Sequence, residues 1–125
     1  IIIIYFCQEL TNLSPNFILT QAPLPSTYAD FWTMVIEQQV EIIVCLLSDL
    51  ELNGHCYWPV ERGQKLEMGK LIISLQSSNT RPNWVERILS IYTHDTKTTR
   101  VVIHLQFTAW PGRFVEKKIR IWKCI

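Results

Sequence analysis

One stretch of the chain carries a cysteine and an arginine, two residue types that together could act on a phosphate ester. The stretch reads His55-Cys56-Tyr57-Trp58-Pro59-Val60-Glu61-Arg62. A cysteine thiolate is a strong nucleophile, and an arginine binds phosphate oxygens through two parallel hydrogen bonds. A phosphate cradle also needs consecutive backbone amides that point inward, usually at glycines that lead into a helix N-terminus.

The residues inside this stretch do not suit such a cradle. Pro59 has no amide proton to donate, and Glu61 would repel a phosphate. Trp58 and Val60 are bulky, and no helix signal follows the arginine. We therefore predict that Cys56-Tyr57-Trp58 is a short strand running into a loop, and that this stretch is not a catalytic loop.

Other residue types that often carry chemistry form no specific pattern. Asp49, Glu51 and His55 do not make a recognisable metal motif. The cysteines include no Cys-x-x-Cys pair, and they are Cys7, Cys45, Cys56 and Cys124. We therefore predict no metal site and no cofactor, and we expect reduced cysteines in an intracellular chain.

Two histidines and two tryptophans are assigned to structure rather than to ligand binding. His94 lies in a polar turn, and His104 alternates with apolar residues along a strand, which places it on the polar face of that strand. Trp58 and Trp84 are predicted to pack against other side chains.

The composition is that of one globular domain with a full core. The chain has 125 residues, of which 48% are hydrophobic and 18% charged, and its formal net charge is +1. Such a balance gives no electrostatic case for a nucleic acid or an anionic membrane as partner. The apolar opening Ile1-Ile2-Ile3-Ile4-Tyr5-Phe6-Cys7 is too short to insert across a membrane.

The clearest element is an amphipathic helix that begins after a proline-locked turn. Phe17–Thr20 is a short strand candidate, and prolines at 23 and 25 forbid both helix and central strand. Thr27 and Asp30 have the spacing of a capping box. The following apolar positions lie at i, i+3, i+4 and i+7 on one helical face, namely Tyr28, Phe31, Trp32 and Val35.

The remaining chain predicts a mixed sheet of the α/β or α+β class. Val40–Leu47 is a β-branched and aliphatic run, typical of a strand that is buried on both faces after a helix crossover. A loop is expected over Ser48–Gly54. Three further strands are predicted, at Lys70–Gln76, Trp84–Tyr92 and Val101–Phe107, and Val101, Ile103, Leu105 and Phe107 form the apolar face of the last one.

Several of these segments together resemble the protein tyrosine phosphatase domain. The resemblance covers residues 14–111 and lies in motifs that occur in the order expected for that family. They are Thr20-Gln21-x-Pro23-Leu24, Thr27-x-x-Asp30-Phe31-Trp32-x-Met34-Val35-x-Glu37-Gln38, Val44-Cys45-Leu46-Leu47, Tyr57-Trp58-Pro59 and Phe107-Thr108-Ala109-Trp110-Pro111.

Within the family, the chain is most similar to the His-domain-containing non-receptor branch, which is cytoplasmic and endosomal. The segments that carry this narrower likeness are Ala22–Pro25, Glu61–Gln64, Val85–Ser90 and His104–Phe107. The resemblance implies phosphotyrosine protein substrates, and endosomal sorting components as further partners of the intact protein.

The resemblance also implies that the catalytic parts are missing from this chain. In the family, a His-Cys-x5-Arg loop supplies the nucleophile and the phosphate site, and it lies downstream of a mobile Trp-Pro-Asp loop that supplies the acid. Trp110 and Pro111 correspond to the hinge of that loop, but Gly112 stands at the position of the acid. We therefore predict an inactive fragment with no catalytic residue, and the alternative is a non-catalytic phosphatase-like binding or scaffold module in endosomal sorting.

Both ends of the chain depart from the family pattern. We expect residues 9–112 to be a partial protein tyrosine phosphatase domain, and residues 1–8 and 113–125 to be non-family tails. Our hypothesis for these tails is translated intron sequence, with a divergent, truncated paralogue as the alternative.

Overall fold

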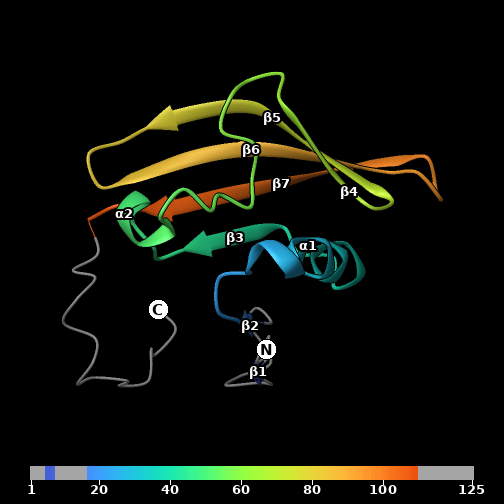
Figure 1. Ribbon diagram of the computed structural model, residues 1–125, viewed down its shortest axis with the longest axis horizontal. Helices are drawn as coiled ribbons and strands as arrows, with labels where there is room; N and C mark the ends of the chain where they lie inside the picture. The colour runs from blue at the N-terminus through green and yellow to red at the C-terminus, as the bar shows by residue number, and fades with distance from the viewer. Residues whose placement is uncertain (1–4, 8–16, 110–125) are drawn as a thin grey trace.

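The computed structural model describes residues 5–7 and 17–109, and its central feature is a mixed five-stranded sheet (Figure 1). The strand order is β3-β7-β6-β5-β4. The elements are β1 (Tyr5–Cys7), β2 (Phe17–Leu19), the 3₁₀ turn η1 (Pro25–Thr27), α1 (Tyr28–Glu37), β3 (Ile42–Cys45), α2 (Asp49–Leu52), β4 (Lys65–Met68), β5 (Leu71–Thr80), β6 (Trp84–Thr93) and β7 (Thr98–Phe107). The mixed sheet and the α+β class predicted from the sequence are confirmed.

The sheet joins one parallel pair to a run of antiparallel strands. β3 pairs in parallel with β7, with Ile42 opposite Ile103, whereas β7, β6, β5 and β4 are antiparallel neighbours. A bulge between Leu75 and Ser77 shifts the register of β5 against β6. β2 pairs with β1 in a separate two-stranded ribbon. It is therefore not the parallel neighbour of β3 that the expected strand-helix-strand crossover required, and the distant β7 is that neighbour instead.

Helix α1 follows the proline turn as predicted, and its apolar face is buried. Phe31, Trp32 and Val35 face the core. The predicted capping box is wrong, however, because the side chain of Thr27 makes no cap to α1. Its hydroxyl instead accepts a hydrogen bond from the Leu24 amide at 3.0 Å, and so closes the preceding 3₁₀ turn.

The stretch predicted as a loop over Ser48–Gly54 contains the short helix α2. Ser48 Oγ accepts a bond from the Glu51 amide, and the Glu51 carboxylate accepts one from the Ser48 amide at 2.9 Å. This reciprocal pairing is a capping box, which satisfies amides that a first helical turn would leave without partners. Asn53 then ends the helix in the left-handed conformation, at φ 48°.

Two assignments between α2 and β5 were also wrong. Cys56-Tyr57-Trp58 is not a strand, because it crosses the inner face of the sheet and buries its aromatic rings there. Strand β4, in contrast, was not predicted, and it pairs with β5 along the outer edge of the sheet. Along β4 the side chains alternate: Lys65 and Glu67 are exposed, whereas Leu66 and Met68 are partly buried.

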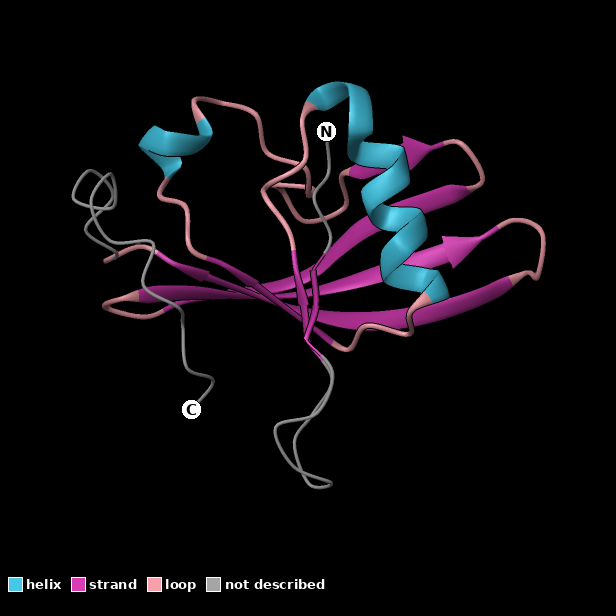
Figure 2. Cartoon of the chain, turned by 90° about the horizontal axis from the view of Figure 1, so that it is seen from below, coloured by secondary structure: helices cyan, strands magenta, loops and turns pink. Residues whose placement is uncertain are grey.

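Only one face of the sheet is covered by helices of the described chain. Figure 2 shows α1 and α2 on the same side. On β3, Ile43 and Cys45 point into the core, while Ile42 and Val44 remain 53% and 61% exposed. The prediction that this strand is buried on both faces is therefore wrong for the described residues.

The covered face of β7 is its more polar face, not the apolar face that the sequence alternation identified. Val102, His104 and Gln106 are buried, whereas Val101 is 58% exposed. The sequence alternation identified the two faces correctly but did not show which of them is covered. Which face of the strand becomes the inner one depends on what packs against it. Here an aromatic cluster packs on the polar face and makes hydrogen bonds to its polar groups.

Replacing Val44 with lysine should reduce self-association without loss of stability. Strand β3 lies at the end of the sheet and presents uncharged residues there, a pattern that favours pairing with other chains. A surface change of this kind alters the free energy of unfolding by no more than about 0.5 kcal/mol. Sedimentation velocity over a concentration series measures the effect, and Val102→Lys is the contrasting variant, because a buried charge should unfold the domain. Unchanged association of Val44→Lys would contradict the assignment of this edge.

Candidate functional site

The most chemically distinctive region is a buried polar and aromatic cluster on the inner face of the sheet. The sheet register brings its strand members together, because Cys45 of β3 lies opposite Gln106 of β7, and His104 of β7 lies opposite Arg87 of β6. The segment after α2 covers them with two aromatic rings. We define the inner polar cluster as Cys45, Tyr57, Trp58, Arg87, His104 and Gln106.

The aromatic rings of the inner polar cluster pack against one another, and the Trp58 ring also contacts a cation. The rings of Tyr57 and Trp58 lie 4.6 Å apart at 86°, and those of Trp58 and His104 lie 4.3 Å apart. The Arg87 guanidinium carbon lies 4.9 Å from the centroid of the Trp58 ring. Such a contact stabilises the cation against the electron-rich ring face.

Hydrogen bonds join the inner polar cluster to both helices. Trp32 of α1 donates its indole N–H to the Tyr57 carbonyl at 2.8 Å. Gln106 donates its amide nitrogen to the Leu47 carbonyl at 3.1 Å and to Asp49 Oδ1 at 2.8 Å, at the start of α2. Tyr57 Oη and His104 Nε2 lie 3.2 Å apart, within hydrogen-bonding distance.

Burial keeps His104 neutral. Desolvation, followed by the nearby positive charge of Arg87, lowers the pKa of His104 from 6.5 to about 3. His104 shares its face of β7 with Gln106, which is the polar face that the alternation predicted, but this face is buried: the His104 side chain is 0% exposed.

The two cysteine thiols of the described core are not activated. Burial raises the pKa of Cys45, and a backbone hydrogen bond at Leu47 and a bond from Tyr57 offset this only in part. Burial, followed by the negative charge of Asp49, raises the pKa of Cys56. A nucleophilic cysteine needs the opposite shift.

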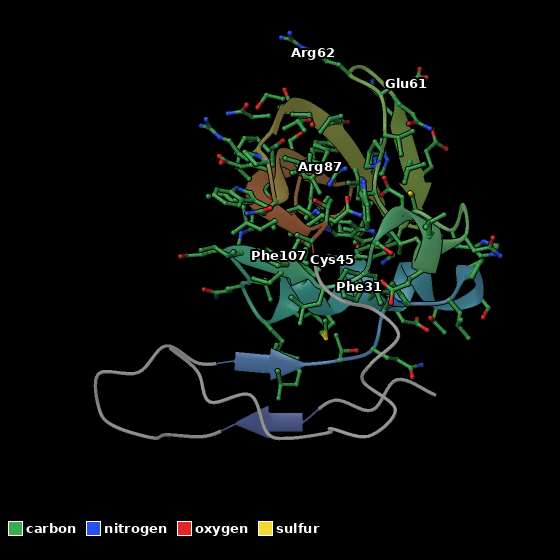
Figure 3. The ribbon with its side chains drawn as sticks, turned by 90° about the vertical axis from the view of Figure 1, so that its left-hand side faces the viewer. Phe31, Cys45, Glu61, Arg62, Arg87 and Phe107 are labelled. Carbon is green, nitrogen blue, oxygen red and sulfur yellow. The ribbon has the colours of Figure 1, made fainter. Side chains whose placement is uncertain are left out.

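Arg62, which the sequence suggested as a partner of Cys56, lies away from the inner polar cluster (Figure 3). Figure 3 shows Arg62 and Glu61 at the outer end of their loop, away from Arg87 and Cys45. The amides of Val60 and Glu61 both donate to Gln64 Oε1, at 2.9 and 3.2 Å. Amides that could have cradled a phosphate are thus already bonded within the loop.

The other residues singled out from the sequence have structural places. His94 lies in the β6–β7 turn, where its amide donates to the Lys70 carbonyl and its ring packs against Tyr92. Trp58 is buried in packing contacts as predicted, whereas Trp84 is partly exposed. Among the described residues, Asp49, Glu51 and His55 included, no three metal-ligating side chains gather.

The residues that the sequence analysis compared with the acid loop of the family lie outside the described residues. They are the hinge residues Trp110 and Pro111, together with Gly112. The chain that leads to them is held where it leaves β7, because the amides of Thr108 and Ala109 both donate to the Asn83 carbonyl, at 2.9 and 3.4 Å.

With a neutral histidine and protonated thiols, the inner polar cluster can position strands and loops but supplies no nucleophile. Sequence reasoning did not identify Arg87 and Gln106 as members of the inner polar cluster, because each is a single polar residue within a strand pattern. Over the part of the chain that is described, no helix is long and apolar enough to span a membrane.

Comparison with known proteins finds a family and several relatives to which this chain is similar. A family model described as protein-tyrosine phosphatase matches residues 5–124. The chain is 44% identical over 109 residues to tyrosine-protein phosphatase non-receptor type 23 of Mus musculus, covering 84% of the chain and 6% of that relative. The Homo sapiens protein of the same name is 43% identical, with 84% of the chain and 7% of that relative covered.

A more distant relative is tyrosine-protein phosphatase non-receptor type 20 of Mus musculus. It is 33% identical over 98 residues, which cover 76% of the chain and 23% of that protein. The chain therefore spans less than a quarter of each of these relatives. The resemblance drawn from the sequence motifs, and its non-receptor character, are confirmed.

Proposed function

Because the chain belongs to the protein-tyrosine phosphatase family, we propose that it is a piece of a catalytic domain whose intact protein hydrolyses phosphotyrosine in proteins. The match of the family model over residues 5–124 is the observation that carries this proposal. The likeness to non-receptor relatives supports a cytoplasmic protein, and endosomal sorting components are proposed as its further partners.

In the intact protein, the reaction would proceed in two balanced steps. A cysteine thiolate attacks phosphorus, the bond from phosphorus to the tyrosyl oxygen breaks, and an acid protonates the leaving oxygen. Water then attacks the cysteinyl phosphate, which releases inorganic phosphate and restores the thiol. The described residues contribute the scaffold of the domain, because α1 and the inner polar cluster hold the sheet from which the acid loop departs.

We also propose that this chain by itself has no phosphatase activity. Two observations support this: the pKa of the Cys56 thiol is raised rather than lowered, and the amides beside Arg62 are bonded to Gln64. The sequence adds that Gly112 has no side chain that could donate a proton.

The purified chain should release no phosphate from a phosphotyrosyl peptide or a generic aryl phosphate above the rate of its Cys56→Ser variant. A malachite green assay measures the phosphate, with an active member of the family as the positive control. Turnover that disappears in Cys56→Ser would show that the Cys56 loop is catalytic and would overturn the proposal of inactivity.

A second candidate function is a phosphatase-like binding or scaffold module without catalysis. The observation that favours it is the glycine at the acid position, since a scaffold has no need of a proton donor. The transcript sequence downstream of the Pro111 codon distinguishes the two functions. A glycine-rich Cys-x5-Arg loop favours the enzyme, whereas a substituted cysteine favours the scaffold.

A further inference from the structure

Four polar atoms of the inner polar cluster are buried without a hydrogen-bond partner among the described residues. They are Trp58 Nε1, Arg87 Nη1, His104 Nδ1 and Gln106 Oε1. The side chains of His104 and Gln106 are fully buried, so bulk solvent does not reach their atoms. Leaving such a group unpaired destabilises the folded chain, and native interiors rarely do so.

The side chains that carry these atoms meet in one place. The Trp58 ring contacts the His104 ring at 4.3 Å and the Arg87 guanidinium at 4.9 Å. Arg87 and His104 are directly opposite one another on neighbouring strands. Gln106 follows two residues after His104 and therefore projects from the same face of β7.

The hydrogen-bonding roles of the four atoms are complementary. The Arg87 and Trp58 nitrogens can only donate. Gln106 Oε1 is an acceptor, because the amide nitrogen of the same side chain already donates to Leu47 and Asp49. The chemistry of these side chains therefore fixes two of the atoms as donors and one as an acceptor.

The role of His104 Nδ1 depends on the tautomer of the ring. The neutral His104 ring carries one proton, and Tyr57 Oη lies 3.2 Å from Nε2, where either atom can be the donor. With that proton on Nε2, the Tyr57 oxygen accepts a hydrogen bond from it and Nδ1 is an acceptor.

We propose that Trp58, Arg87, His104 and Gln106 enclose one internal water molecule, which accepts hydrogen bonds from the first two and donates to the last two. Two donors and two acceptors complete the four bonds that a water molecule can make. An anion fits less well, because Gln106 Oε1 can only accept hydrogen bonds and the negative Asp49 carboxylate is bonded to the amide nitrogen of the same side chain. The site is independent of the proposed catalytic function.

A crystal structure of the full chain, soaked in sodium bromide, tests the occupant. The expected result is an ordered water peak within hydrogen-bonding distance of all four atoms, with no anomalous signal from bromide. An empty site would overturn the proposal, as would bromide at that position.

The tautomer of His104 provides a test in solution. In the ¹⁵N spectrum of the histidine-labelled chain, the His104 signal should show a proton on Nε2 and none on Nδ1. A proton on Nδ1 would overturn the proposal.

Arg87→Met removes one donor, and the exposed Arg62→Met is its matched control. The water peak should be lost from crystals of Arg87→Met and kept in Arg62→Met. A fully occupied water in folded Arg87→Met would overturn the assigned bonding. If that variant does not fold, the density and the tautomer of the unmodified chain decide the question.

Discussion

Replacing Trp32 with alanine is expected to lower the free energy of unfolding by about 3–5 kcal/mol, the typical cost of emptying a large aromatic site in a core. The Trp32 side chain is 0% exposed and packs edge to face against Phe31 at 5.5 Å. Its indole N–H also donates to the Tyr57 carbonyl. Truncation therefore removes buried area and leaves a buried carbonyl without its partner.

Urea denaturation followed by far-ultraviolet circular dichroism measures this change. The neighbouring Thr33→Ala is a matched control, since that side chain is exposed on the same helix. Trp32→Phe should lie between the two, because it keeps an aromatic ring but loses the hydrogen bond. Small domains are stable by only about 5–15 kcal/mol, so Trp32→Ala could leave much of the chain unfolded at zero urea. A loss equal to that of Thr33→Ala would show that α1 does not pack as described.

Stability should fall as the pH falls from 6.5 towards 3, because folding holds His104 in its neutral form. The pKa of His104 is 6.5 when the chain is unfolded and about 3 when it is folded. Between these values the unfolded chain binds more protons, so acid favours unfolding. Each pH unit within this window costs about 1.4 kcal/mol, and the full stability from this group is present above pH 6.5.

The effect of His104 is isolated by comparison with a variant. Burial is the main cause of the shift, and the charge of Arg87 from β6 adds to it, while Tyr57 contacts the ring from the covering segment. Free energies of unfolding measured from pH 7 to 4 should fall more steeply for the unmodified chain than for His104→Gln. The exposed His94→Gln is the control and should keep the steep slope. Equal slopes for the unmodified chain and His104→Gln would contradict a buried neutral histidine.

Elements with strong local signals could be predicted from the sequence. The proline turn, the i, i+3, i+4, i+7 pattern of α1 and the alternating strands β5 to β7 all depend on neighbouring residues. Helix α2 was missed because one short turn has no periodicity, although Ser48 and Glu51 carry the capping-box spacing. Strand β4 was missed because an edge strand that is half-exposed resembles a polar loop.

The sequence by itself determined the family and the course of α1, because motifs and local residue patterns are properties of the chain alone. Only the tertiary structure decided which face of β7 is buried. An alternating strand offers two faces, and the free energy of each depends on what packs against it. Here Trp58 and Tyr57 cover His104 and Gln106, and hydrogen bonds offset part of the cost of burying those polar groups. These contacts join residues far apart in the chain, so no local pattern could have predicted them.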